Sequence, residues 1–103
     1  MRKQAGLKTD AIAYCIALIH KQPDSGYGIS FPDVPGVTAV ADTLDEAMRE
    51  AAIVLGFAFE DWSGERPAPR TLDALRQDTQ FLDLSTDAVV AAVTPAPSLA
   101  DAA

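Results

Sequence analysis

Cysteine, histidine and basic residues are scarce in this chain of 103 residues. Because Cys15 is the only cysteine, no intrachain disulfide can form, and we expect the protein to work in the reducing cytoplasm. One Cys and one His do not supply the ligands of a structural zinc site. His20 has no serine or cysteine nucleophile in a recognisable motif beside it. We therefore expect no catalytic residue, no metal, no cofactor and no enzyme activity.

Long apolar runs are also missing. Residues 11–19 are apolar and follow a few basic residues, which is the outline of a signal peptide. The run lacks a small-residue cleavage site and is far shorter than the roughly 20 apolar residues that span a bilayer. We interpret it as a buried strand and expect no association with a membrane.

Carboxylates outnumber basic side chains by 15 to 8, which gives a formal net charge of -7. A surface of that sign repels phosphate backbones over most of its area and suits a basic protein partner. The imbalance is sharpest from Ala11 to Trp62, where only Lys21 and Arg49 are basic. The carboxylates of that segment are Asp24, Asp33, Asp42, Asp45, Glu46, Glu50, Glu60 and Asp61.

The remaining patterns predict an α+β fold, a small antiparallel sheet with one main packed helix in the order β-β-β-α-β. Strands are expected at residues 11–20, 27–31, 37–41 and 89–93. Residues 71–77 are expected to add one or two helical turns. We expect one domain over residues 1–94 and a disordered tail over residues 95–103, which is rich in Ala, Pro, Ser and Asp.

The main helix has a clear start at Thr43-Leu44-Asp45-Glu46, which fits a capping box. Apolar residues then recur every three or four positions through about Trp62 and form the face expected to pack on the sheet. These residues are Leu44, Ala47, Met48, Ala51, Leu55, Ala58 and Phe59. Glycine inside a helix costs about 1 kcal/mol relative to alanine, so we expect a tight helix-to-sheet contact at Gly56.

Both faces of the first strand are apolar, whereas a two-layer domain buries only one face of its sheet. Small Ala13, Cys15 and Ala17 alternate there with larger Tyr14, Ile16 and Leu18. We expect the small side chains to lie under the main helix and the large ones to meet another subunit or a partner protein. The expected assembly is a homo-oligomer, either a dimer or a tetramer.

A rigid turn joins the second and third strands. Pro32 and Pro35 fix two φ angles and remove two donors, and Gly36 frees the backbone to re-enter the sheet. This turn, Phe31-Pro32-Asp33-Val34-Pro35-Gly36, lies shortly before Asp42-Thr43-Leu44-Asp45-Glu46-Ala47. Together with Tyr14, Gly26-Tyr27-Gly28 and Pro67-Ala68-Pro69, these segments resemble the pattern of HicB-type antitoxins over residues 14–70.

The resemblance implies a partial ribonuclease-H-like fold without nuclease activity, which binds and blocks a small basic HicA-type toxin that cleaves mRNA. Asp33, Asp45 and Glu46 are the candidates for charged contacts with that toxin. Many members of the family also carry a C-terminal DNA-binding domain, but no Lys or Arg occurs from Asp83 to Ala103. We therefore expect no direct DNA binding by this segment.

The residues alone leave other interpretations of the function open. A magnesium site made only of carboxylates could form from Asp33, Asp42, Asp45 and Glu46 and serve an enzyme or a ligand-binding domain. The second apolar face could pair only with another copy of the chain, giving a stand-alone homo-oligomer without a toxin. The acidic balance could also be a solvated surface that keeps a small protein in solution.

Overall fold

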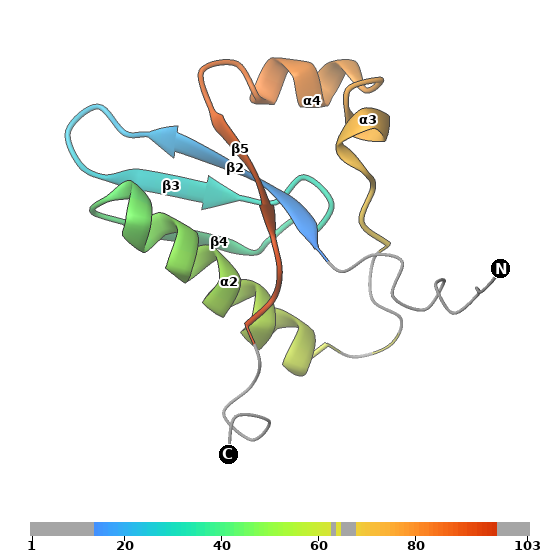
Figure 1. Cartoon of the computed structure of the whole chain (residues 1–103), viewed down its shortest axis with the longest axis horizontal. Helices are drawn as coiled ribbons and strands as arrows, with labels where there is room; N and C mark the ends of the chain where they lie inside the picture. The colour runs from blue at the N-terminus through green and yellow to red at the C-terminus, as the bar shows by residue number, and fades with distance from the viewer. Residues whose placement is uncertain (1–13, 63, 65–67, 97–103) are drawn as a thin grey trace, which may run out of the picture.

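A computed structural model describes residues 14–62, 64 and 68–96 of the chain. Figure 1 shows the long helix on one side of the sheet and the short helices on the other. The elements are β2 (Cys15–Lys21), β3 (Tyr27–Ser30), β4 (Thr38–Ala41), α2 (Leu44–Glu60), α3 (Leu72–Leu75), α4 (Thr79–Leu84) and β5 (Val89–Val93). The predicted α+β fold with one main helix is confirmed. Residues 11–13 of the first predicted strand lie outside the described residues.

The four strands form one antiparallel sheet in the order β4-β3-β2-β5. Their registers place Ile19 opposite Ile29 and Val89, and Ile29 opposite Ala39, which makes an apolar row across the sheet. Because β4 and β5 are the outer strands, each has one edge that no other described strand covers.

The capping box starts α2 as predicted. The Glu46 amide donates to the Thr43 hydroxyl at 3.1 Å, and the Glu46 carboxylate reaches back to accept from the Asp42 amide at 3.2 Å. Two of the amide donors at this end of the chain segment are thereby satisfied by side chains. The helix direction is fixed directly after β4, which lies along α2 in Figure 1.

The apolar face of α2 packs on the sheet through Ala47, Ala51 and Leu55, all fully buried. Leu44 and Met48 were also predicted to pack there, but they are 38% and 37% exposed. Leu44 is the first helical residue, and Met48 lies on the flank of the buried stripe. The prediction was therefore wrong for Leu44 and Met48 and right for Ala47, Ala51 and Leu55.

Gly56 does mark a close approach, but not to the sheet. A side chain at this position would collide with main-chain atoms of Ala96, which follows β5. The Ala96 amide donates to the Ala52 carbonyl at 3.0 Å. The predicted helix-to-sheet contact is thus replaced by a contact between α2 and the chain after β5, within the segment predicted to be a tail.

The face of β2 opposite α2 is covered from within the chain. Ile16 and Leu18 are 4% and 1% exposed and pack with Leu75 of α3 and Phe81 of α4. We predicted that another subunit or protein would supply this cover, and the structure corrects that prediction. The small side chains of β2 lie on the α2 side as expected, where Cys15 and Ala17 join the main core. Ala13 lies outside the described residues.

Candidate functional site

The turn between β3 and β4 is tightly built. Phe31 and Val34 are buried, and Val34 takes part in two main-chain hydrogen bonds, from its amide to the Phe31 carbonyl and from the Val37 amide to its own carbonyl. Gly36 has φ of 95°, a conformation that favours glycine. These local interactions account for the Phe31 to Gly36 motif without a bound partner.

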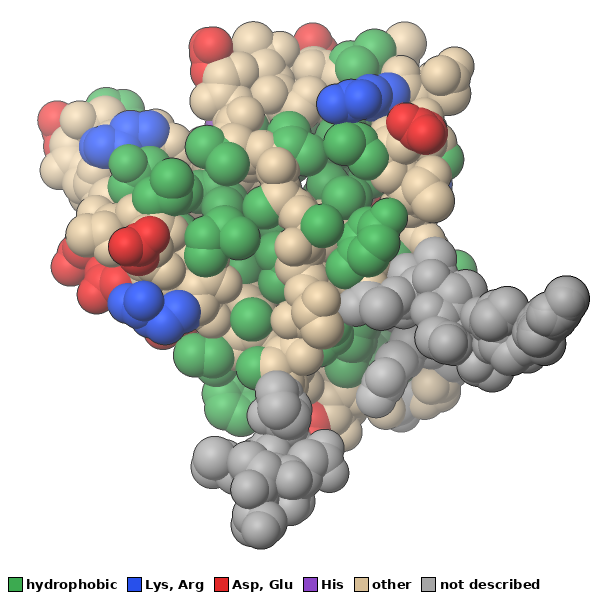
Figure 2. All heavy atoms as spheres, viewed as in Figure 1, with side chains coloured by type: hydrophobic (Ala, Val, Ile, Leu, Met, Phe, Trp, Pro, Cys, Tyr) green, Lys and Arg blue, Asp and Glu red, His purple; other side chains and the backbone are tan. Residues whose placement is uncertain are grey.

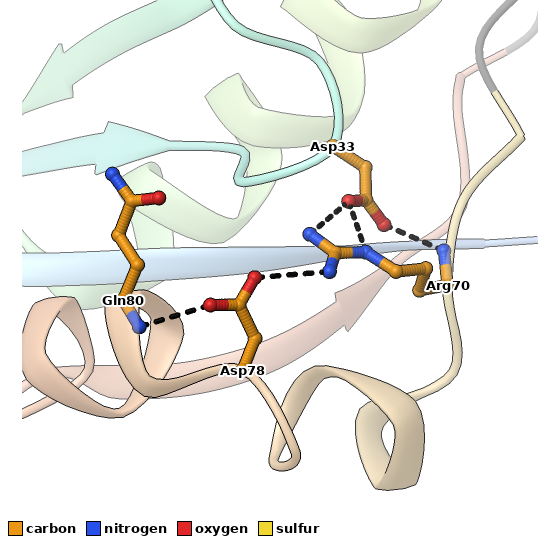
Figure 3. A network of polar contacts seen from close by, with 4 residues as sticks. All are labelled: Asp33, Arg70, Asp78 and Gln80. Carbon is orange, nitrogen blue, oxygen red and sulfur yellow. Dashed lines mark hydrogen bonds and ion pairs between the residues drawn. The ribbon is translucent and has the colours of Figure 1, made fainter.

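The side chain of Asp33 extends from this turn and binds Arg70, as Figure 3 shows. Its carboxylate accepts from the Arg70 amide at 2.5 Å and from the Arg70 Nε at 2.8 Å. The Arg70 guanidinium also reaches Asp78 at 3.1 Å, and Asp78 accepts from the Gln80 amide at 2.9 Å. The network therefore ties the β3–β4 turn to the N-terminal caps of the short helices.

Charge reinforces this network. The hydrogen bond from Arg70 holds the pKa of the Asp78 carboxyl below its ordinary value, and the bond from the Gln80 amide adds to the effect. The Asp33 carboxylate, and then that of Asp78, raise the pKa of the Arg70 guanidinium. The Asp33 side chain is only 9% exposed. The Asp33 carboxylate is therefore paired with Arg70 within the fold and has a structural role there.

The other two predicted contact residues lie at the start of α2. Glu46 is half-buried and holds the Asp42 amide. Asp45 is exposed, and within the described residues its side chain makes no hydrogen bond or ion pair. Of the three predicted carboxylates, Asp45 is the one whose charge is fully presented to the solvent.

An acidic corner surrounds this helix start, formed by Asp42, Asp45, Glu46 and Glu50. Figure 2 shows acidic side chains gathered at the end of the molecule where α2 begins. A hollow of about 640 Å³ opens beside the corner, between the β2–β3 turn, β4 and α2. Its lining includes Asp42, Glu46 and Glu50, and Arg49 is the one basic residue among the described residues that line it.

The outer strand β4 borders this hollow. Val40 is 78% exposed, more than any other large hydrophobic side chain in the described part of the chain. Val40 was not predicted from the sequence to be part of a site. The alternation of side chains along the strand is the sequence signal for its outward position. Val37, Ala39 and Ala41 pack towards the core, so Val40 between them faces outwards.

Neither Cys15 nor His20 is presented for chemistry. Cys15 is 1% exposed, and burial, followed by the nearby charge of Asp33, raises the pKa of its thiol. The His20 Nε2 hydrogen-bonds the Leu84 carbonyl at 2.8 Å, which links β2 to the end of α4. Cys15 is therefore a core residue, and His20 is a link between β2 and α4.

The magnesium alternative lacks a ligand cluster. Across residues 14–62, 64 and 68–96, no three His, Cys, Asp or Glu side chains lie together in a way that could hold a metal ion. Asp33 is bound to Arg70 and does not line the hollow beside Glu46. The pairing of Asp33 with Arg70 could not be predicted from the sequence, because the two residues are 37 positions apart and no local pattern links them.

No helix in the described residues is both long and apolar enough to cross a membrane. No curated protein matches the chain. The family model described as the HicB-like antitoxin of the bacterial toxin–antitoxin system matches residues 14–100, which covers most of the chain. That range includes the turn, the capped helix, the short helices and β5. The chain therefore belongs to the HicB-like antitoxin family of bacterial toxin–antitoxin systems.

Proposed function

We propose that this HicB-like antitoxin binds a HicA-type toxin and stops its cleavage of mRNA by covering the toxin's RNA-binding surface. A surface that binds RNA attracts phosphate groups and is therefore basic. A compact acidic protein competes for the same surface. The protein acts in the cytoplasm, has no catalytic activity of its own and uses no cofactor.

The observation that carries this proposal is the acidic corner at the start of α2. Asp45 is exposed, and Glu50 borders the open hollow beside it. Arg49 is the one basic residue among the described residues that line this hollow, and the Arg70 charge is taken up by Asp33 and Asp78.

Complementary charge raises the rate of association and selects the partner, while buried apolar contacts supply much of the affinity. Asp45 is the proposed direct contact among the three predicted carboxylates. Asp33 and Glu46 support binding by holding the β3–β4 turn and the start of α2 in place. Their loss would disturb the surface as well as its charge.

A homo-oligomer, dimer or tetramer, stays a prediction, as does the partial ribonuclease-H-like relationship. Ile16 and Leu18 are buried under α3 and α4, so an oligomer would need another surface. Tyr14, at the margin of this cluster, is half-buried and is the member of the predicted face that a partner can reach.

The test is an mRNA-cleavage assay with a purified HicA-type toxin from the same genome and increasing amounts of this chain. We expect cleavage to stop once the chain matches the toxin in concentration. Asp45→Lys should weaken inhibition and reduce its salt dependence. Asp83→Lys, which makes the same charge change on α4, should leave inhibition intact. Cleavage that continues in excess chain would refute the proposed function.

A further inference from the structure

β4 is an outer strand of the sheet. It pairs with β3 on one side and with no described strand on the other. In an antiparallel strand, alternate residues direct their N–H and C=O groups away from the neighbour. Proteins commonly blunt such edges with charges, prolines or bulges. The segment Thr38–Ala41, with the sequence TAVA, contains neither a charge nor a proline.

The surroundings of β4 are open on the face away from α2. The short helices cover β2 through Ile16 and Leu18, and the core that they form includes no residue of β3 or β4. Small or polar side chains, Gly28, Ser30 and Thr38, line a shallow hollow there together with Val40. An extended chain laid along β4 would find open main-chain groups at the edge and an apolar contact on Val40.

The other outer strand differs. Val89 and Val90 of β5 are 44% and 37% exposed, about half the exposure of Val40. The chain that follows β5 is fastened to α2 by the bond from Ala96 to Ala52. Phe81 and Leu75 pack on the face beside β5. The edge at β4 is therefore the more accessible of the two.

Charge decides what fits this edge. Asp42 directly follows β4, and Glu46 and Glu50 line the hollow beside it, against Arg49 alone. A second copy paired antiparallel across a two-fold axis would set the Thr38 end of its β4 beside Asp42, and Thr38–Ala41 carries no basic side chain to meet the acidic corner. An extended segment with a basic side chain instead meets opposite charge.

We propose that a HicA-type toxin adds an extended basic segment to the edge of β4, with an apolar side chain against Val40 and a basic side chain in the hollow beside Glu50. This inference rests on the proposed function and names the surface through which it acts. Main-chain hydrogen bonds align the added strand, and the hollow selects the basic side chain.

The test compares the affinities of full-length variants for a purified HicA-type toxin, measured by calorimetry at two salt concentrations. Val40→Lys places a cation where the basic segment docks and should weaken binding at least about tenfold. Val89→Lys makes the same change on β5 and should stay within about twofold of the unaltered chain. Thermal unfolding of each variant checks that the fold is retained.

A second pair of variants tests the charged contact without changing any residue of the sheet. Glu50→Lys should weaken binding about tenfold and flatten its salt dependence, whereas Glu60→Lys, near the other end of α2, should change affinity by less than about twofold. Binding of Val40→Lys and Glu50→Lys at unaltered affinity would overturn this inference and leave the proposed function standing.

Two further outcomes would also overturn it. If the unaltered chain forms no complex with the toxin, the proposed function fails and the docking edge fails with it. If the chain alone dimerises and Val40→Lys abolishes the dimer, β4 is occupied by a second copy rather than by a basic segment.

Discussion

On one face of the sheet a single helix of 17 residues packs against a core that draws on all four strands. On the other face two short helices pack on β2, and the cluster that they form includes no residue of β3 or β4. The first face is covered by α2, whose start is fixed by local hydrogen bonds among Asp42, Thr43 and Glu46. The second is closed by segments held in place by Asp33, Arg70 and Asp78. The part of the second face formed by β3 and β4 adjoins the acidic corner, where we place the toxin.

Removing the anchor of the short helices should have the largest effect. Phe81→Ala leaves Ile16 and Leu18 without their cover, and we expect the free energy of unfolding to fall by about 3–5 kcal/mol. Urea denaturation measures this loss. Leu82→Ala, at an exposed neighbouring position, should cost no more than about 0.5 kcal/mol. Equal stabilities of the two variants would show that α4 does not close this face.

The matching change on the α2 face is Leu55→Ala, which we expect to cost about 2–5 kcal/mol in urea denaturation. Ile53→Ala, on the exposed side of the same helix, is the control and should stay within about 1 kcal/mol of the unaltered chain. If Phe81→Ala proves harmless while Leu55→Ala unfolds the protein, the second face is an accessory layer.

A smaller effect is expected at the contact between α2 and the chain after β5. Gly56→Ala places a methyl group against main-chain atoms of Ala96, so that segment must move. The gain in helix propensity, about 1 kcal/mol, offsets part of the loss, and the net change in stability should be small. The Ala96 amide should exchange with solvent faster because its bond to Ala52 is lost. Unchanged exchange at Ala96 would contradict the described contact.

The smallest effect concerns pH and the Asp78 carboxyl. Its pKa is lower in the folded state than the ordinary 3.8, so its contribution to stability is complete above that value and is lost as the pH falls through the lower folded pKa. Asp78→Asn should therefore reduce stability at neutral pH, and the gap to the unaltered chain should narrow between about pH 5 and about pH 2. Urea denaturation across this range checks the trend, and a constant gap would refute it.

The sequence predicted the α2 face well because its signals are local. Thr43 and Glu46 fix the helix start, and Ala47, Ala51 and Leu55 repeat every four residues. The apolar character of Ile16 and Leu18 also indicated a second cover. It did not show that α4 supplies this cover, because Phe81 is one anchor in a short helix with little periodicity of its own.

The structure places the carboxylates that were named from the sequence in different surroundings. Asp45 was named from sequence and is exposed at the helix start, whereas Asp33 was named and proves to be bound to Arg70. That pairing depends on how the chain folds back across 37 positions, which no spacing rule encodes. Val40 was missed because the alternation along the strand shows only that it faces away from the core, and the order of the strands is needed to show that β4 is an outer strand.

Amide hydrogen exchange of the full chain, alone and with a purified HicA-type toxin, tests the central claim most directly. We predict that the toxin slows exchange in β4 and in the first turns of α2, and leaves α3, α4 and β5 unchanged. Protection of α4 and β5 with no change at β4 would contradict the account, because the toxin would then dock on the side that the chain closes for itself.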